Sequence, residues 1–550
     1  MGLLDDSWSQ LSWFAVLLWA IGGYTVVHVV RRQIERRRLH RTGGARTAMY
    51  RGKWPWGLDL AYRAVLAVVY HQNRELWENI FRSTGLHTAE FRVLGRRIIF
   101  TDDPENIKAL LATQFGDYGK GEPFHREWKE FLGDSIFTTD GARWHASRQL
   151  IRPQFVKDRV SDLQIFESHL QTLFIAMSVG GDAAATAAAL QSPASGPVSS
   201  SGRVLEMSDL FFRFTLDVAT DFLLGTDIQS LTIPRQEFAE AFNEVQHMQS
   251  MISRTGPANI FVPRFAYRRG LKVMDKFLDL FIERALCLPV EELEKSTTGA
   301  AGRYTFLHEL ARFTRDRKVL RDQLIAVLLA GRDTTAGTLS WGIYELARHP
   351  ECVQRLRAEI AEVVGVEGAQ GTSCRLPTYA DLKSMRYLQH VLNEILRMYP
   401  AVPYNVRLAL HDTTLPRGGG PDGSLPVSIL KDTPIGYSTL TMQRRGDLYP
   451  ETQGHKASLR GPGTFCPERW DHWQPKPWHY IPFNGGPRIC IGQQFALTEM
   501  GYVLVRLLQK FERIVSHMGP IDGGHPTLKA DIVLQPGDGV HVAFFEAAKA

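Results

Sequence analysis

An uncharged, apolar stretch near the N-terminus is followed at once by a block of basic residues. Residues 11–30 carry no formal charge, and a helix of about 20 apolar residues can cross a hydrocarbon core of roughly 30 Å. Trp8, Trp13 and Trp19 suit a membrane or its interface. The pattern predicts an uncleaved transmembrane anchor over residues 11–30, with a signal peptide and a buried helix as alternatives.

The charges around this stretch indicate its orientation. Asp5 and Asp6 precede it, whereas arginines crowd residues 31–41, and positive charge favours the cytosolic side of a membrane. We therefore expect a lumenal N-terminus over residues 1–10 and a basic stop-transfer and hinge segment over residues 31–57. The remainder would be cytosolic, tied to the endoplasmic reticulum membrane by a single pass.

Behind the anchor, apolar residues recur mostly at helical spacing. Residues 91–101 alternate instead and predict a short β-hairpin, and Asp102-Asp103-Pro104 predicts an N-cap for the helix that follows. The expected helices cover residues 59–80, 105–111, 211–224 and 321–349, with amphipathic stretches over residues 238–271. The sequence thus predicts a mainly α fold with small β-sheets, in one large domain over residues 58–550.

Residues 180–202 interrupt this pattern with a low-complexity run of alanine, serine, glycine and proline. Such a composition lacks the large apolar side chains that a core requires. We expect a disordered insertion in a surface loop.

Composition narrows the class of protein. The 550 residues are 44% hydrophobic and 22% charged, enough for a large core. The net charge is +6, but much of the excess lies in the N-terminal block, so the domain offers no basic surface for nucleic acid. The five cysteines are scattered without the spacing of a disulfide framework, which indicates a reducing compartment.

The candidate chemistry begins at residues 483–496, FNGGPRICIGQQFA. Cys490 lies in a glycine-rich loop, and glycines such as Gly486 and Gly492 let the backbone pass close to a flat cofactor. Arg488 can pair with an anionic edge of that cofactor. One cysteine thiolate can hold the iron of a haem, whereas zinc and iron–sulfur sites need several protein ligands. The alternative is a structural cysteine buried in a turn.

A second candidate lies within residues 321–349, at Ala330-Gly331-Arg332-Asp333-Thr334. Gly331 costs a helix interior about 1 kcal/mol relative to alanine, and Thr334 can bond a carbonyl one turn back. We expect a local opening of the helix at Ala330 and Gly331, with Asp333 and Thr334 as a proton relay. An N-cap or turn is the alternative, because Asp and Thr favour both.

Both motifs resemble those of the cytochrome P-450 superfamily. The pattern F-x-x-G-x-R-x-C-x-G, beginning at Phe483, is similar to its haem-binding signature, and residues 330–334 are similar to its oxygen-activating helix. The resemblance implies a P-450 fold with a haem held through Cys490. It also implies that Trp144 and Arg148, four apart on one helical face, bind a haem propionate, and that Arg407 reaches a propionate as well.

The resemblance also assigns a charged core. Glu394 and Arg397 stand three residues apart, a common spacing that recurs at Glu35 and at Glu345. In the family, the copy followed by a P-E-R segment and the cysteine loop forms a buried network. Here that segment supplies Arg469. The resemblance implies a structural role for Glu394, Arg397 and Arg469, whereas exposed pairs would contribute almost nothing.

The residues 118–121, YGKG, and the cysteine loop resemble the fungal n-alkane and fatty-acid ω-hydroxylase family in particular. Ala330 stands where a related hydroxylase group carries a glutamate esterified to the haem, so a non-covalent haem b is implied. The resemblance further implies electrons from NADPH through a flavoprotein reductase, with cytochrome b5 as another possible donor. Arg143, Arg152 and Lys157 are candidates for its docking surface, although ordinary surface charge is the alternative.

The function implied is that of a membrane-bound haem-thiolate monooxygenase that hydroxylates a lipophilic substrate at or near the end of an alkyl chain. The same chemistry on an aromatic or secondary-metabolite substrate is the nearer alternative. A haem sensor or carrier without turnover is the remote one, because a carrier needs no proton relay such as Asp333 and Thr334.

Overall fold

The computed structural model describes residues 2–155, 162–191, 201–297, 305–367, 374–449 and 461–547. The α-helices of this part of the chain are α1 (Gly2–Arg41), α2 (Leu58–Val69), α3 (Asn73–Thr84), α4 (Pro104–Lys108), α5 (Gly121–Leu132), α6 (Gly141–Ile151), α8 (Gln164–Ser178), α9 (Ala183–Gln191), α10 (Met207–Leu224), α11 (Glu237–Thr255), α12 (Phe265–Cys287), α13 (Val290–Thr297), α14 (Phe306–Phe313), α15 (Arg317–Leu346), α16 (Pro350–Val363), α17 (Tyr379–Ser384), α18 (Arg386–Met398), α19 (Thr439–Met442), α20 (Arg469–His472), α21 (Gln493–Lys510) and α22 (Gly519–Asp522).

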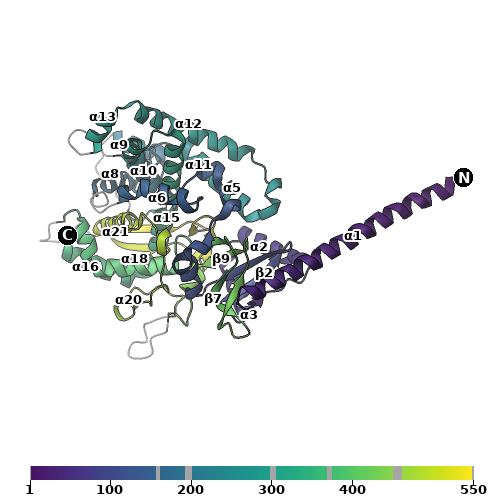
Figure 1. Ribbon diagram of the computed structural model, residues 1–550. Helices are drawn as coiled ribbons and strands as arrows, with labels where there is room; N and C mark the ends of the chain where they lie inside the picture. Colours follow the sequence, from purple (N-terminus) through teal and green to yellow (C-terminus); the bar gives the residue numbers. More distant parts are fainter. Residues whose placement is uncertain are drawn as a thin grey trace.

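The strands are β1 (Ala48–Met49), β2 (Thr88–Val93), β3 (Arg96–Thr101), β4 (Tyr118–Gly119), β5 (Val204–Glu206), β6 (Tyr404–Ala409), β7 (Thr413–Gly419), β8 (Leu425–Ile429), β9 (Pro434–Ser438), β10 (Phe511–Ser516), β11 (Leu528–Ala530), β12 (Leu534–Pro536) and β13 (His541–Glu546). In Figure 1, the strands β2, β7 and β9 lie beside the base of α1, whereas α8 to α13 gather in the opposite half, with α15 in the middle of the molecule. The predicted mainly α fold with small sheets is confirmed.

The largest sheet has six strands in the order β1-β2-β3-β9-β6-β4. Strands β2 and β3 pair antiparallel, with Phe91 opposite Ile98, as the alternation of residues 91–101 predicts. Asp103 caps α4 by accepting hydrogen bonds from the amides of Glu105 and Asn106 at 2.9 and 3.2 Å, which confirms the predicted N-cap. Strand β6 lies between β9 and β4 and forms one wall of the interior described below.

Helix α1 leaves the domain as a single helix of 40 residues (Figure 1). Its C-terminal end is held by two ion pairs, Glu35 with Arg92 and Arg38 with Asp412. Strand β1, which follows α1, already pairs with β2. The domain therefore begins before the turn at residues 53–57, earlier than the boundary that the sequence predicts.

We searched the described residues for helices that could cross a membrane. No single helix among them has the required length and apolar character. Helices α8 and α9, joined at an angle of 111°, meet both criteria together as a bent pair.

Two predicted elements are wrong in part. The helix expected over residues 59–80 is two helices, because His71 adopts a left-handed backbone conformation (φ 57°) between α2 and α3. The insertion expected to be disordered over residues 180–202 contains α9, since alanine has the highest helix propensity, and Thr186 of α9 is fully buried. Residues 192–200 of this insertion lie outside the described residues.

The long helix α15 is the axis on which the other elements pack. Asp316 caps its N-terminus by accepting hydrogen bonds from the amides of Lys318 and Val319, and nearly every residue from Leu320 on is buried. Near its C-terminal end, Trp341 stacks on Tyr399 of the neighbouring segment with ring centres 4.1 Å apart. Such stacking adds about 0.5–1.5 kcal/mol beyond burial.

The local opening predicted in α15 at Ala330 and Gly331 does not occur in the structure, where the helix is continuous from Arg317 to Leu346. Thr334 does donate its hydroxyl to the Ala330 carbonyl, at 2.6 Å, but this bond does not interrupt the helix. A threonine that bonds one turn back is compatible with an intact helix.

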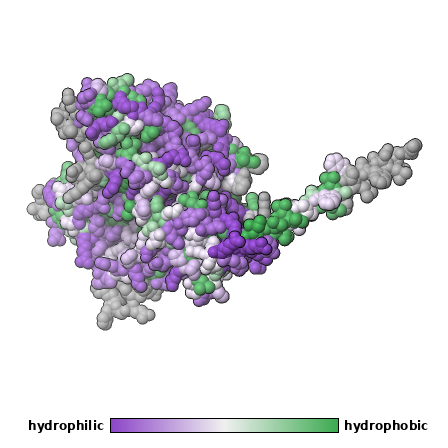
Figure 2. All heavy atoms as spheres, viewed as in Figure 1, coloured by the Kyte–Doolittle hydropathy of each residue, from purple (hydrophilic) through white to green (hydrophobic). Residues whose placement is uncertain are grey.

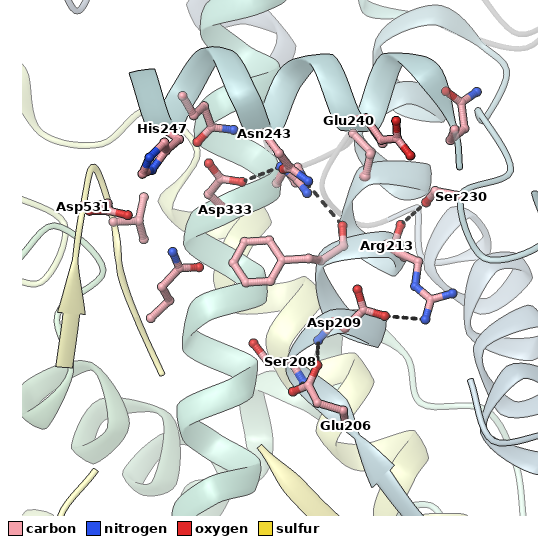
Figure 3. Close-up of a pocket in the computed structure, with 18 of the residues that line it drawn as sticks. Glu206, Ser208, Asp209, Arg213, Ser230, Glu240, Asn243, His247, Asp333 and Asp531 are labelled. Atoms are coloured by element: carbon pink, nitrogen blue, oxygen red, sulfur yellow. Dashed lines mark hydrogen bonds and ion pairs between the residues drawn. The ribbon is translucent and has the colours of Figure 1, made fainter. Parts of the chain in front are cut away.

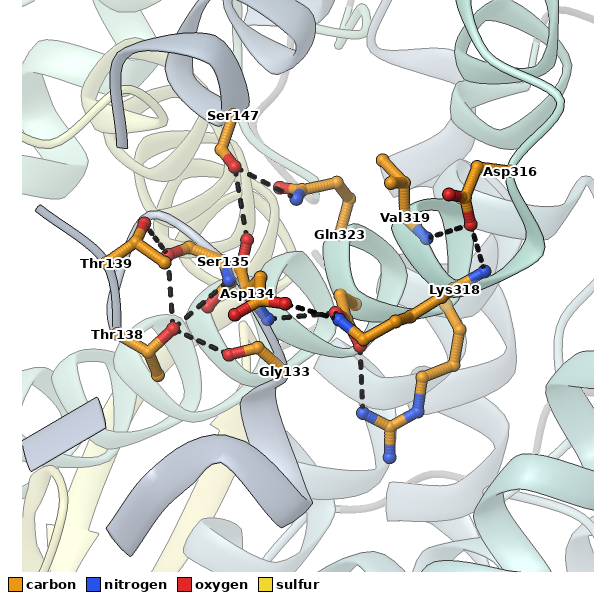
Figure 4. A network of polar contacts seen from close by, with 12 residues as sticks. Gly133, Asp134, Ser135, Thr138, Thr139, Ser147, Asp316, Lys318, Val319 and Gln323 are labelled. Carbon is orange, nitrogen blue, oxygen red and sulfur yellow. Dashed lines mark hydrogen bonds and ion pairs between the residues drawn. The ribbon is translucent and has the colours of Figure 1, made fainter. Parts of the chain in front are cut away.

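A polar network fastens the loop between α5 and α6 to the start of α15 (Figure 4). The Asp134 amide donates to Asp322 Oδ2 at 2.8 Å, and Lys318 Nζ lies 2.6 Å from Asp134 and 2.7 Å from Asp322. Burial opposes ionisation of Asp134, but bonds from Lys318 and His125 outweigh it and hold the pKa of this carboxyl at about 2. The network fixes the segment that leads into α6 and Trp144.

We predict that Gly133→Ala destabilises the protein much more than Gly141→Ala. Both glycines have positive φ, +54° and +57°, so a side chain strains the backbone in both variants. The strain is larger at Gly133, whose ψ of −143° lies in a region that glycine almost alone adopts. A Cβ at Gly133 would lie 1.9 Å from the Asp322 carboxylate, whereas a Cβ at Gly141 meets nothing within 4 Å. Displacing a buried, paired carboxylate adds about 3–5 kcal/mol. Equal losses in urea unfolding would contradict this assignment.

Candidate active site

The loop that carries Cys490 is folded tightly back on itself. The Cys490 amide donates to the Phe483 carbonyl at 2.9 Å, which closes the loop. At Gly486 the backbone is left-handed (φ 65°), and a Cβ there would lie 1.9 Å from the Leu111 carbonyl oxygen, so no residue with a side chain fits. Asn484, also at positive φ, accepts a hydrogen bond from the Tyr437 hydroxyl at 2.9 Å. The loop thus has a preformed shape.

The Cys490 thiol faces a hollow inside the protein. Its surface is accessible to solvent, although protein atoms surround the residue closely enough for burial to raise the pKa of the thiol. A backbone hydrogen bond from Gly492 and the charge of Arg148 oppose this rise. The two opposing contributions are the ones that would stabilise the sulfur as a thiolate ligand.

One face of α15 also lines open space. Val327, Ala330, Gly331 and Thr334 stand at spacings of three and four and are only partly buried, while their neighbours along the helix are nearly all fully buried. A Cβ on Gly331 would come no closer than 4.0 Å to another side chain, that of Ala219. The sequence motif of residues 330–334 therefore opens onto a small space, although the helix itself is intact.

Three cations meet between β6, the Cys490 loop and the N-terminal end of α5. Lys120 Nζ and Arg407 Nη1 both donate to Asn405 Oδ1, at 2.9 and 3.1 Å, and Arg488 donates to Asp140 Oδ1 at 2.6 Å. Burial, followed by repulsion from Arg407 and Arg488, lowers the pKa of Lys120 well below its usual range. For Arg488, burial and Arg407 lower the pKa to about 10.

The two remaining residues expected at a haem edge, Trp144 and Arg148, lie on α6 beside this cluster. The Arg488 guanidinium lies over the Trp144 ring at 4.7 Å, within the range of a cation–π contact. Arg148 donates to the Ile489 carbonyl at 2.9 Å, next to Cys490. The structure therefore brings Trp144, Arg148, Arg407 and Arg488 together beside the Cys490 loop, although Arg148 is turned toward the loop itself.

These residues fit a haem. The cluster holds more buried positive charge than Asp140 alone can neutralise, so it suits the two carboxylates of a haem edge. Arg488 Nε is buried and has no hydrogen-bond partner, which is the state of a donor that awaits an acceptor. In the described part of the chain, no group of three or more His, Cys, Asp or Glu side chains could hold a metal ion. A haem needs only one such side chain, because its ring supplies the other ligands to the iron.

Lys120 and Asp140 are site residues that the sequence analysis missed. Lys120 was visible only as part of the YGKG motif, and Asp140 accepts the amides of Lys120 and Gly121 at 2.9 and 2.8 Å. A lysine followed by glycine carries no sign of burial in the sequence. Its place beside Arg407 and Arg488 depends on the pairing of β4 with β6.

Behind the Cys490 loop, Glu394 and Arg397 are fully buried and form a double hydrogen bond, with both N–O distances 2.8 Å. Glu394 also accepts the Cys466 amide at 3.1 Å and lies 3.4 Å from Arg469 Nε. Burial opposes ionisation of Glu394, but Arg397 and Arg469 outweigh it and hold its pKa below the usual value. The same spacing of Glu and Arg, three residues apart, does not give the same pairing elsewhere, since Glu35 pairs with Arg92 and not with Arg38.

Gln443 extends this network, a role that the sequence did not reveal. Its side-chain amide donates to the carbonyls of Leu396 and Arg397 at 3.1 and 3.0 Å, and its Oε1 accepts the Ile481 amide at 2.9 Å. Its own carbonyl accepts Arg397 Nη1 at 2.9 Å. Gln443 therefore joins α18 to the segment that leads into the Cys490 loop.

Asp333 lies apart from the cation cluster, in a pocket between α10, α11 and α15 (Figure 3). It is buried, and Arg332 Nη1 lies 3.3 Å from its Oδ1. Burial raises the pKa of Asp333 to about 6, against the opposing effect of Arg332 and a hydrogen bond with Gln246. Its neighbour Thr334 is on the open face of α15, so the two relay candidates point into different spaces.

The chain belongs to the cytochrome P450 family, whose family model, Cytochrome P450, matches residues 65–540. It is 56% identical over 496 residues to cytochrome P450 monooxygenase pvhE of Talaromyces variabilis, covering 90% of this chain and 89% of that protein. Cytochrome P450 52A12 of Debaryomyces hansenii is 38% identical over 542 residues, covering 94% and 95%. The crystal structure of the cytochrome P450DA haem domain shares the fold, with a TM-score of 0.69 and 20% identity over 92% of this chain and 99% of that one.

The predicted membership and the P-450 fold are thus confirmed, and the protein is a cytochrome P450 monooxygenase, an oxidoreductase of a haem-thiolate family. The remote alternative of a haem carrier without turnover is not supported.

We predict that Glu394→Gln costs about 3–5 kcal/mol of stability, because it removes the carboxylate that pairs with the fully buried Arg397. Glu78→Gln is the control, since Glu78 faces Arg74 at 3.5 Å on the surface of α3 and such pairs contribute at most about 1 kcal/mol. Chemical unfolding of the two variants beside the wild type measures the difference. A small effect of Glu394→Gln would show that the network is not needed for folding.

Proposed function

We propose that this monooxygenase hydroxylates medium- or long-chain alkyl substrates, n-alkanes or fatty acids, at or near the chain terminus. The observation that carries the proposal is the uncharged face of α15 formed by Val327, Ala330, Gly331 and Thr334, which is only partly buried. Apolar side chains packed against the core cluster that includes α15 are likewise only partly buried, among them Phe124, Ile136 and Phe137. The sequence resemblance to fungal alkane and fatty-acid hydroxylases supports the same substrate class.

A haem b, held without a covalent bond to its ring, is the proposed cofactor. When bound, it supplies the iron at which dioxygen is reduced. Cys490 would be the axial thiolate, and Lys120, Arg407, Arg488, Trp144 and Arg148 would hold the propionate edge. The net reaction converts one C–H bond and one dioxygen, with two electrons and two protons, into one C–OH bond and one water.

The two protons need a path through the protein. Asp333 is the proposed entry point, because a carboxyl with a pKa of about 6 both gains and loses a proton near neutral pH. Thr334 is the proposed final donor, since its hydroxyl is on the open face of α15. Water would bridge the two, because neighbouring side chains on one helix point about 100° apart.

The electrons are proposed to come from NADPH through a flavoprotein reductase, with cytochrome b5 as a further donor. Arg143 and Arg152 are exposed on and just after α6, the helix that also carries Trp144 and Arg148, and cations there would attract an acidic partner. Lys157, the third residue predicted for this surface, lies outside the described residues.

We also propose that α1 anchors the protein in the endoplasmic reticulum membrane, with residues 1–10 in the lumen and the enzyme in the cytosol. Figure 2 shows apolar side chains along the part of α1 that leaves the domain. Trp13 and Trp19 are 74% and 83% exposed there, and nearby Leu58 and Tyr62 of α2 are exposed as well. So much exposed apolar surface favours contact with lipid.

A spectroscopic titration tests the substrate class. Adding n-alkanes and fatty acids of increasing length to the purified holoenzyme should shift the haem absorption from low to high spin, with affinity rising by about 0.8 kcal/mol per buried methylene. Aromatic acids of similar size serve as the control set. If the aromatic compounds shift the spectrum and no alkyl chain does, the aromatic or secondary-metabolite alternative replaces the proposal.

A second measurement tests the anchor. Removing residues 2–30 should move the enzyme from the membrane pellet to the alkaline-carbonate supernatant, because the uncharged helix is the proposed source of insertion. Replacing Val26, Val27 and Val29 by serine in the full chain should weaken retention in the same direction. Complete release of the wild-type protein by carbonate would contradict a transmembrane anchor.

A further inference from the structure

Arg332, the residue between Gly331 and Asp333, is buried and held from three sides. Its guanidinium lies over the rings of Phe212 on α10 and Phe242 on α11, at 5.2 and 5.4 Å. Its Nη1 donates to Asn243 Oδ1 at 2.7 Å. Arginine side chains are expensive to bury, so this enclosure between two helices indicates a specific role rather than surface charge.

The same guanidinium is the close counter-charge of Asp333. Arg332 Nη1 lies 3.3 Å from Asp333 Oδ1, but this oxygen is buried and has no hydrogen bond of regular geometry. A buried carboxylate oxygen normally has a partner. Asp333 is therefore held by the charge of Arg332 and by a hydrogen bond with Gln246, while its Oδ1 remains an acceptor that one water molecule could satisfy.

Water has room to reach it. Asp333 and Arg332 line a pocket of about 720 Å³, and Figure 3 shows Asp333 between Asn243 and His247 of α11 in this pocket. The other charged or titratable groups that line the pocket are Glu206 at the end of β5, Asp209 and Arg213 on α10, Arg235 just before α11, Glu240 and His247 on α11, and Lys529 and Asp531 at the β11–β12 hairpin. Charged groups of both signs make the pocket hydrophilic enough to hold water.

We propose that Arg332 is a positioning residue for proton delivery: it holds the Asp333 carboxyl toward the water-filled pocket between α10 and α11 and sets the pH range in which this carboxyl passes protons on. The inference rests on the proposed relay through Asp333. The new element is that α10 and α11 influence the relay by packing on Arg332, through Phe212, Phe242 and Asn243. These contacts lie away from the open face of α15 that carries Thr334.

The direction of the effect follows from the charges. Burial raises the pKa of Asp333, and Arg332 lowers it. Removing the guanidinium should thus raise this pKa further, by at least about one pH unit, as is typical for an opposite charge at this distance. The carboxyl would then be protonated in a larger fraction of molecules at neutral pH and would release its proton less readily.

The test measures coupling, the fraction of NADPH consumption that yields product, between pH 5.5 and about 9 in the reductase-reconstituted holoenzyme. In a plot of coupling against pH, Arg332→Gln should move the part of the curve that reports the ionisation of Asp333 upward by about one pH unit. Arg332→Lys, which keeps the charge, should restore most of the wild-type position. Arg235→Gln is the matched control, because Arg235 is exposed at the rim of the same pocket.

The pH dependence of the free energy of unfolding provides a second measurement that does not require turnover. The pKa of Asp333 is raised from 3.8 to about 6 in the folded protein, so its contribution to the free energy of unfolding is complete below pH 3.8 and is lost as the pH rises through about 6. Asp333→Asn should remove this dependence, and Arg332→Gln should extend it to higher pH. Asn243→Ala, at an exposed position, should give a smaller shift in the same direction if Arg332→Gln folds poorly.

The outcomes are distinct. The role of Arg332 is overturned if Arg332→Gln and Asn243→Ala leave the pH profile of coupling unchanged while Asp333→Asn couples poorly. The relay then remains in place. Wild-type coupling in Asp333→Asn overturns the relay itself and the inference with it. A shift in Arg235→Gln equal to that in Arg332→Gln would show a general charge effect and also overturn the positioning role.

Discussion

The buried pairing of Glu394 with Arg397 and Arg469 is the interaction on which the rest of the structure depends. Glu394 and Arg397 have no exposed surface, so their charges are stable only together. The network joins α18 to the Cys466 amide and, through Gln443, to Ile481 just before the Cys490 loop. The position of the proposed thiolate is thus supported by an ion network that braces the segment leading into the loop.

A second charged region has the opposite character. Lys120, Arg407 and Arg488 lie together with Asp140 as their nearby carboxylate, and the pKa values of Lys120 and Arg488 are lowered because burial and mutual repulsion disfavour their charges. In the network around Glu394 each arginine is paired with the carboxylate, whereas in this cluster three cations share one nearby carboxylate. An anionic cofactor edge would complete it, and this difference separates the part of the fold that stabilises from the part that binds.

Helix α15 presents different faces to different parts of the protein. Ala330, Gly331 and Thr334 lie on its partly buried face, while Arg332 and Asp333 line the pocket between α10 and α11. Five consecutive residues serve both sides, because successive side chains on a helix point in different directions. An intact helix therefore suffices, and the opening that the glycine suggests is not required to make room.

The sequence by itself determined the family, through the motif around Cys490 and the motif of residues 330–334, and it also determined the hairpin at residues 91–101. Each of these features depends on residues close together in the chain. The sequence misjudged the break at His71 and the helix α9, since a single backbone conformation and the burial of Thr186 are set by neighbouring elements. Only the tertiary structure decided that Lys120 joins Arg407 and Arg488, that Gln443 braces Arg397, and that Arg332 lies between Phe212 and Phe242. These contacts join segments far apart in the chain, and their energies depend on burial and on charges that local patterns do not contain.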